Sequence, residues 1–187
     1  MRVLRRSVLA GALALLALGG GACGSSSGAP AVLAPVPSDM IPTQLAGSPG
    51  DTPMVLREDK QGAQRIDHAG PRSMVAHGRV FEVRRNDTLV AALQIATLRA
   101  KVDVSSAKQR DKLAALVVSG AVQKIRVAGV EVVAAQSANK IVFLWFGDQL
   151  FEVLQVKGDG LKPEQMLKDI LDFQKPTGHL RIRGNRA

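Results

Sequence analysis

The sequence predicts an α+β domain, in which an antiparallel sheet packs against two amphipathic helices in the order ββ-α-βββ(β)-α. Two apolar runs, 80–83 and 88–98, predict a pair of strands. Three or four further runs alternate between residues 125 and 156. Two segments with helical spacing, 108–118 and 164–174, follow the two groups of strands. Groups of consecutive strands separated by single helices are typical of antiparallel α+β folds.

The first elements are a polar lead-in and a hairpin. Residues 57–73 are polar and charged. A helix around 57–66 is one interpretation, but Gly62 interrupts it, so this segment is treated as a loop or lead-in. Val80–Val83 alternates, and Thr88–Leu98 is rich in valine, leucine and isoleucine. Asn86-Asp87 lies between these runs and is typical of a tight turn, which predicts a β-hairpin.

The later strands form a predicted meander. Gly147-Asp148 is a hairpin signal between the last two runs, and residues 137–139 separate the middle pair. The predicted strands are Ile125–Val127, Gly129–Ala134, Lys140–Phe146 and Leu150–Val156.

Both helices carry start signals. Ser106 followed by Gln109 forms a capping-box pattern ahead of Lys108–Val118. Pro163 opens Glu164–Gln174, where the apolar residues follow helical spacing. The C-terminal segment is therefore the clearest helix in the sequence.

The N-terminus is typical of an export signal. Arg2, Arg5 and Arg6 precede the apolar run 7–18, and the small residues 19–22 suit a signal peptidase. The apolar run is too short to span a bilayer as a helix of about 20 residues. Residues 1–22 are therefore predicted to be a signal peptide.

Cys23, the only cysteine, directly follows this signal. The chain here resembles the bacterial lipoprotein family, on Leu18, Gly20, Gly21, Ala22 and Cys23, although Gly20 stands where the lipobox usually has leucine. The resemblance implies a diacylglyceryl (palmitate-type) membrane anchor on the Cys23 thiol and a cell-membrane, extracytoplasmic location. The alternative is an ordinary secretory signal that leaves a free thiol.

The next segment has the composition of a tether. Residues 23–54 begin with glycine and serine and contain most of the prolines, which disfavours helices and central strands. We therefore expect 23–54 to be a disordered linker and 55–187 to be one α+β domain. Met40-Ile41 and Met54–Leu56 are the parts of this region that are apolar enough to dock onto the domain.

The C-terminal part also resembles a known architecture. Residues 130–173 contain the strand Phe143–Phe146, then Gly147-Asp148, a returning strand and a closing helix. This order is similar to the PsbP-like α/β/α sandwich. The resemblance covers about a third of the chain, implies only the architecture and brings no catalytic motif.

The sequence contains no pattern typical of a catalytic or metal site. The histidines, His68, His77 and His179, lie far apart, so we expect no metal and no cofactor. The serines lack a nucleophile-elbow motif, and Ser106 is explained as a helix cap. A hydrolase with dispersed catalytic residues is therefore the least favoured alternative, and we expect a non-enzymatic protein.

Two features suggest binding. Trp145, Phe146 and Phe151 are clustered, and they either pack in the core or contact a ligand or partner. Because Trp145 and Phe146 are consecutive in a strand, burial of both requires a sheet covered on both faces. The net charge of +9 has two interpretations: a solvated basic face that only confers solubility, or a surface for anionic partners. Export argues against nucleic acid as the partner, which leaves lipid headgroups or acidic cell-wall polymers.

These observations favour a lipid-anchored accessory protein that contacts an envelope protein, lipid or polymer. The alternative is a carrier of a hydrophobic ligand such as a lipid, which requires a cavity between sheet and helices near Trp145.

Overall fold

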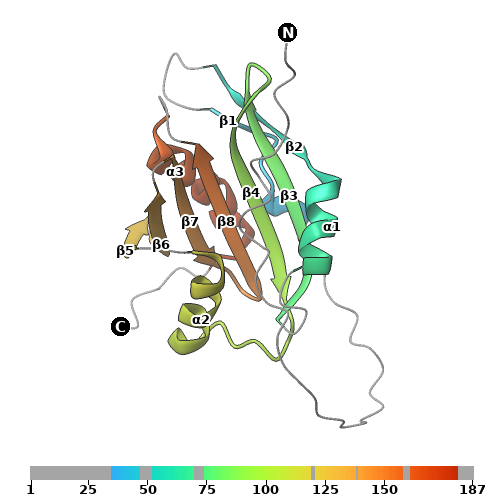
Figure 1. Ribbon diagram of the computed structural model, residues 1–187, viewed down its shortest axis with the longest axis vertical. Coiled ribbons are helices and arrows are strands. Elements are labelled where there is room, and N and C mark those ends of the chain that lie inside the picture. The colour runs from blue at the N-terminus through green and yellow to red at the C-terminus, as the bar shows by residue number, and fades with distance from the viewer. Residues whose placement is uncertain are drawn as a thin grey trace.

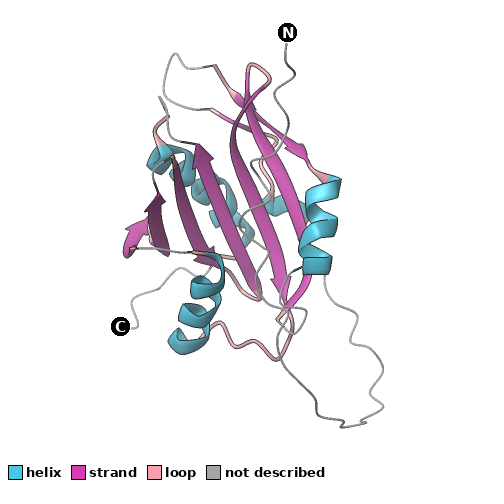
Figure 2. Ribbon diagram, in the orientation of Figure 1, coloured by secondary structure: helices cyan, strands magenta, loops and turns pink. Residues whose placement is uncertain are grey.

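The computed structural model describes residues 35–46, 52–69, 74–118, 121–137, 139–157 and 161–180. Within these ranges the chain forms one 8-stranded antiparallel sheet with helices packed against it (Figures 1 and 2). The strand order is β1-β2-β3-β4-β8-β7-β6-β5. The predicted α+β class with an antiparallel sheet is confirmed, although the observed order of elements is longer than the predicted one.

The elements have the following bounds. The strands are β1 Gln44–Leu45, β2 Met54–Glu58, β3 Val75–Arg85, β4 Thr88–Leu98, β5 Val122–Val127, β6 Val130–Ser137, β7 Lys140–Phe146 and β8 Leu150–Lys157. The helices are α1 Lys60–Ala69, α2 Ala107–Val117 and α3 Pro163–Gln174, with the 3-10 helices η1 Ser38–Met40 and η2 Lys175–Thr177.

The hairpins form where the turn residues predict them. Asn86 and Asp87 have φ values of 47° and 62°, and they join β3 to β4. Positive φ at both central residues is the geometry that two-residue hairpins prefer. Ala128 and Gly129 adopt the same geometry between β5 and β6, with φ values of 51° and 86°, so Gly129 lies in a turn and not in the predicted strand Gly129–Ala134. The predicted hairpin and meander are therefore confirmed.

The two faces of the sheet bury separate hydrophobic clusters. Trp145 belongs to one cluster and Phe146 to the other, as the alternation of a strand requires. The Trp145 face packs against α3, through Met166, Leu167, Ile170 and Leu171. The opposite face packs against α2, through Leu113 and Ala114. Trp145 and Phe146 are both buried, and the sheet is covered on both faces, as burial of two consecutive strand residues requires.

The predicted helix caps have the expected positions. Ser106 accepts a hydrogen bond from the backbone N–H of Gln109 at 3.4 Å, and it begins α2. The Gln109 side chain does not complete the capping box, because its Oε1 accepts from the backbone N–H of Asp103 at 2.9 Å. Pro163 is the first residue of α3. The N–H at this position has no intrahelical partner in any helix, so proline fits there without the loss of a hydrogen bond.

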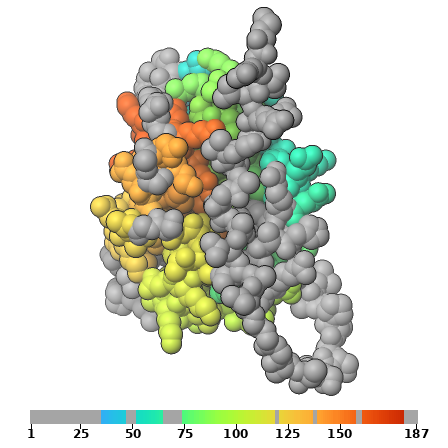
Figure 3. Space-filling view, in the orientation of Figure 1, coloured from blue at the N-terminus to red at the C-terminus, as the bar shows by residue number. Residues whose placement is uncertain are grey.

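The prediction that residues 57–73 form a loop or lead-in is wrong, because β2 ends at Glu58 and α1 follows it. The helical alternative for 57–66 overlaps α1. Gly62, interpreted as a helix breaker, allows close packing. A Cβ at Gly62 would lie 3.2 Å from Cβ of Val80 and 2.6 Å from Oδ2 of Asp59. Asp59 in turn accepts a hydrogen bond from the Gly62 N–H at 3.0 Å near the start of the helix. Figures 1 and 3 show α1 and α2 at opposite sides of one face of the sheet.

Residues of the expected linker also pack on the domain. Val36, Met40, Leu45 and Met54 are buried in the cluster on the Trp145 face. β1 pairs with β2, with Gln44 opposite Val55. Part of the segment 23–54 is therefore ordered against the sheet, and the packed unit begins before residue 55.

Candidate functional site

The structure places the aromatic candidates in the core. Trp145 is fully buried, and Phe146 and Phe151 are buried on the opposite face of the sheet. The rings of Phe146 and Phe151 pack with their centroids 5.8 Å apart. None of the three presents its ring on a surface open to a ligand or partner. Cys23 lies outside the described residues.

Trp145 is part of a buried polar network. Glu152 lies opposite Trp145 on β8 and is fully buried. Its Oε1 accepts a hydrogen bond from Nε1 of Trp145 at 3.0 Å, and its Oε2 accepts one from Nε2 of Gln174 at 2.6 Å. The same Gln174 nitrogen donates to the carbonyl oxygen of Met40 at 3.0 Å. The network therefore joins two central strands, the end of α3 and the N-terminal segment.

Burial changes the acidity of this network. Desolvation raises the pKa of Glu152 from 4.5 to about 8, because the ionised carboxylate loses its water. The hydrogen bonds from Gln174 and Trp145 favour the ionised form and act against this shift. At neutral pH the carboxyl group is therefore mostly protonated, which keeps an uncompensated charge out of the core.

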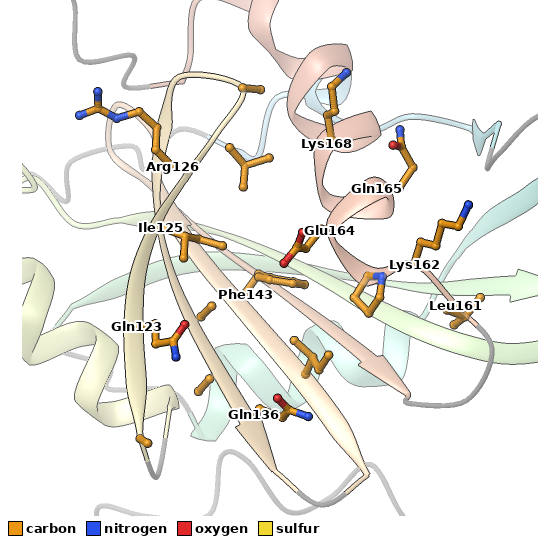
Figure 4. A pocket seen from close by; sticks show the side chains of 17 residues that line it. Gln123, Ile125, Arg126, Gln136, Phe143, Leu161, Lys162, Glu164, Gln165 and Lys168 are labelled. Carbon is orange, nitrogen blue, oxygen red and sulfur yellow. The ribbon is translucent and has the colours of Figure 1, made fainter.

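A cavity of about 1010 Å³ lies between the meander and the start of α3 (Figure 4). Its walls come from β5, β6 and β7 on one side and from residues 161–168 on the other. The apolar part of the lining includes Ile125, Val127, Ala134, Ile141, Phe143 and Leu161. Phe143 lies on the same sheet face as Trp145, but Trp145 itself does not line the cavity. We call this cavity the β5–α3 groove.

Polar and charged side chains lie at the edge of the apolar part of the groove lining. Gln123 and Gln136 come from β5 and β6, and Gln165 comes from α3. The charged lining residues are Arg126, Lys162, Glu164 and Lys168. In Figure 4 the Glu164 side chain extends from α3 toward Ile125, across the groove. An apolar floor with a few polar groups at its edge is the usual composition of a ligand-binding site.

The groove residues were not among the candidate site residues predicted from the sequence. They come from three strands and from the segment 161–168, and no motif joins them. Two weaker signals are present in the sequence. Glu164 and Lys168 are four residues apart, so they share a helix face, and Gln123, Ile125 and Val127 alternate along β5.

The described histidines do not gather into a site. The backbone N–H of His77 donates to Oγ1 of Thr97 at 3.2 Å, and Nε2 of His179 lies 3.9 Å from Oδ2 of Asp39. The described residues contain no group of three or more His, Cys, Asp or Glu side chains that could hold a metal ion.

Comparison with known proteins gives no relative: no family model, no curated protein and no solved structure has a significant match to the chain. The similarity of residues 130–173 to the PsbP-like sandwich therefore stays a prediction. Among the helices of the described ranges, none is both long and apolar enough to cross a bilayer.

Proposed function

We propose that this chain is a lipid-anchored, extracytoplasmic binding protein without catalytic activity, and that the β5–α3 groove is its ligand-binding site. The anchor would be the lipidated Cys23, and residues 24–34 would connect it to the packed unit. In the envelope the ligand would be part of a neighbouring protein, a lipid or an anionic cell-wall polymer.

The groove supports the binding part of this proposal. It has about 1010 Å³ of volume, which is at the top of the range of roughly 300–1,000 Å³ for small-molecule sites. Its lining combines half-buried aliphatic side chains with the amides of Gln123, Gln136 and Gln165. These groups offer apolar contact and hydrogen bonds, and the single carboxylate of the lining is Glu164.

A carrier of a hydrophobic ligand is the second candidate. This function predicts a cavity between the sheet and the helices near Trp145. The groove lies between the sheet and α3, but Trp145 does not line it. Ile125, Ile141 and Leu161 supply the apolar surface that such a ligand needs. The groove supports this candidate because its apolar floor suits a hydrocarbon chain better than a polymer backbone.

The test uses the full-length protein isolated from membranes of its own cells. Native mass spectrometry and organic extraction would detect a bound ligand. Ala134→Phe places a ring in the half-buried lining of the groove, and Val122→Phe is the matched control, since Val122 is 53% exposed and does not line the groove.

We expect a co-purifying ligand in the parent protein and in Val122→Phe, and its loss in Ala134→Phe. Retention of the same ligand in all three proteins would place binding elsewhere. An absence of ligand from all three would contradict the proposed function of the groove.

A further inference from the structure

We infer that the ligand of the β5–α3 groove is an amphiphile with one apolar chain and an anionic headgroup. This inference rests on the proposed function, and it adds the chemical class of the ligand. The apolar floor of the groove and the sign of its charged edge support this ligand class.

The floor has the chemistry of a chain-binding surface. Ile125, Ala134 and Ile141 lie on neighbouring strands and face the same side of the sheet as the buried Phe143, which is directly opposite Ala134. Ile125 and Ile141 are half-buried, so they still present apolar area to a ligand. Each methylene that leaves water on such a surface stabilises the complex.

The charged edge favours an anion. Two lysines, Lys162 and Lys168, line the groove on the α3 side against one carboxylate, Glu164. The side chain of Arg126 on β5 points away from the groove in Figure 4, on the sheet face of its cross-strand neighbour Glu131, so it is not part of this edge. A headgroup at the mouth of the groove would therefore meet more positive than negative charge.

Two contacts modulate this edge. Nζ of Lys168 lies 2.6 Å from Oδ2 of Asp172, in an exposed pair that a ligand can compete with. Glu164 extends toward Ile125 and would repel an anionic headgroup. Removal of the Glu164 charge should therefore strengthen binding of an anion, and it should weaken binding of a cation.

The experiment compares three probes with the same chain: dodecyl phosphate, dodecyl maltoside and dodecyltrimethylammonium. Each is titrated below its micelle concentration into the purified protein by calorimetry, and inorganic phosphate is a fourth probe. The variants are Lys162→Ala, Glu164→Gln and the groove-filling Ala134→Phe. Lys112→Ala is the charge control, since Lys112 is exposed on α2 and does not line the groove.

We expect dodecyl phosphate to bind about tenfold more tightly than dodecyl maltoside, with a larger difference at low salt. Lys162→Ala should weaken dodecyl phosphate binding by about two- to fivefold, and Glu164→Gln should strengthen it by a similar factor. Ala134→Phe should abolish binding, and Lys112→Ala should leave it unchanged. Inorganic phosphate should bind far more weakly, because it has no apolar chain to pack against the floor of the groove.

Other results would overturn the inference in separable ways. Equal binding of the three amphiphiles would exclude a role for the headgroup charge. If dodecyltrimethylammonium binds more tightly than dodecyl phosphate, and Glu164→Gln weakens its binding, the headgroup of the ligand is cationic. If inorganic phosphate binds as tightly as dodecyl phosphate, the apolar chain of the ligand does not contribute to binding. If no probe binds while the protein from cells still carries a ligand that Ala134→Phe removes, the ligand class is wrong and the proposed function stands.

Discussion

The indole N–H of Trp145 donates a hydrogen bond of 3.0 Å to Glu152, the residue directly opposite on the neighbouring strand. Both side chains are fully buried. A buried carboxyl group is stable only when its polar atoms have partners or when it takes up a proton. Here both conditions contribute, because Gln174 supplies a second donor and burial raises the pKa of Glu152 to about 8.

The stability of the fold should therefore depend on pH through Glu152. Its pKa is about 8 when folded and near 4.5 when exposed, so the folded state binds more protons between these values. Its contribution is fully present below pH 4.5 and is lost as pH rises to about 8. We expect the free energy of unfolding to fall in this window, by at most about 1.4 kcal/mol per pH unit.

Urea denaturation at a series of pH values would measure this dependence, with Glu152→Gln as the comparison. The amide does not titrate, so the difference in stability between the two proteins should change steadily across the window and stay constant above it. Parallel stability curves for the parent protein and Glu152→Gln would show that the carboxyl group keeps an ordinary pKa.

Replacement of Trp145 separates the hydrogen bond from the packing. Trp145→Phe keeps an aromatic ring but removes the donor to Glu152, and should cost about 1–3 kcal/mol. Trp145→Ala also leaves a cavity, and should cost about 3–5 kcal/mol. Denaturation followed by circular dichroism measures both, since Trp145 is the only tryptophan. Equal losses for the two variants would mean that ring packing contributes little beyond the hydrogen bond.

Met40→Ala tests whether the N-terminal segment belongs to the folded unit. The Met40 side chain is fully buried among the residues that pack on α3, and its carbonyl oxygen accepts from Gln174. We expect the variant to lose about 2–5 kcal/mol in urea denaturation, as buried methionine truncations do. Ser38→Ala is the control, because Ser38 is exposed in the same segment. If the two variants are equally stable, residues 35–46 act as a tether rather than as part of the core.

The elements that the sequence predicts correctly are those with local signals. Asn86 and Asp87 adopt the positive φ values that a two-residue hairpin needs, and Ser106 caps α2. The alternation at Trp145 and Phe146 places their rings on opposite faces of the sheet, as the structure shows. In each case the information lies within a few neighbouring residues.

The missed elements depend on distant partners. β1 has two residues, and its pairing with β2 defines it as a strand. Gly62 breaks the helical pattern in the sequence, but in the fold the missing Cβ allows α1 to approach Val80. The groove was missed for the same reason, because β5, β6, β7 and the start of α3 form it together.

The anchor prediction is independent of the fold. Cys23→Ser removes the thiol that would carry the diacylglyceryl group. We expect the parent protein in the membrane fraction and the variant in the soluble extracytoplasmic fraction, because two or more acyl chains hold a protein stably at a bilayer. Fractionation and the intact mass of the N-terminal peptide would measure this, with Ser25→Ala as the control. A Cys23→Ser variant that stays on the membrane in high salt would point to an uncleaved signal. A parent protein without acyl chains would show that the protein is freely secreted.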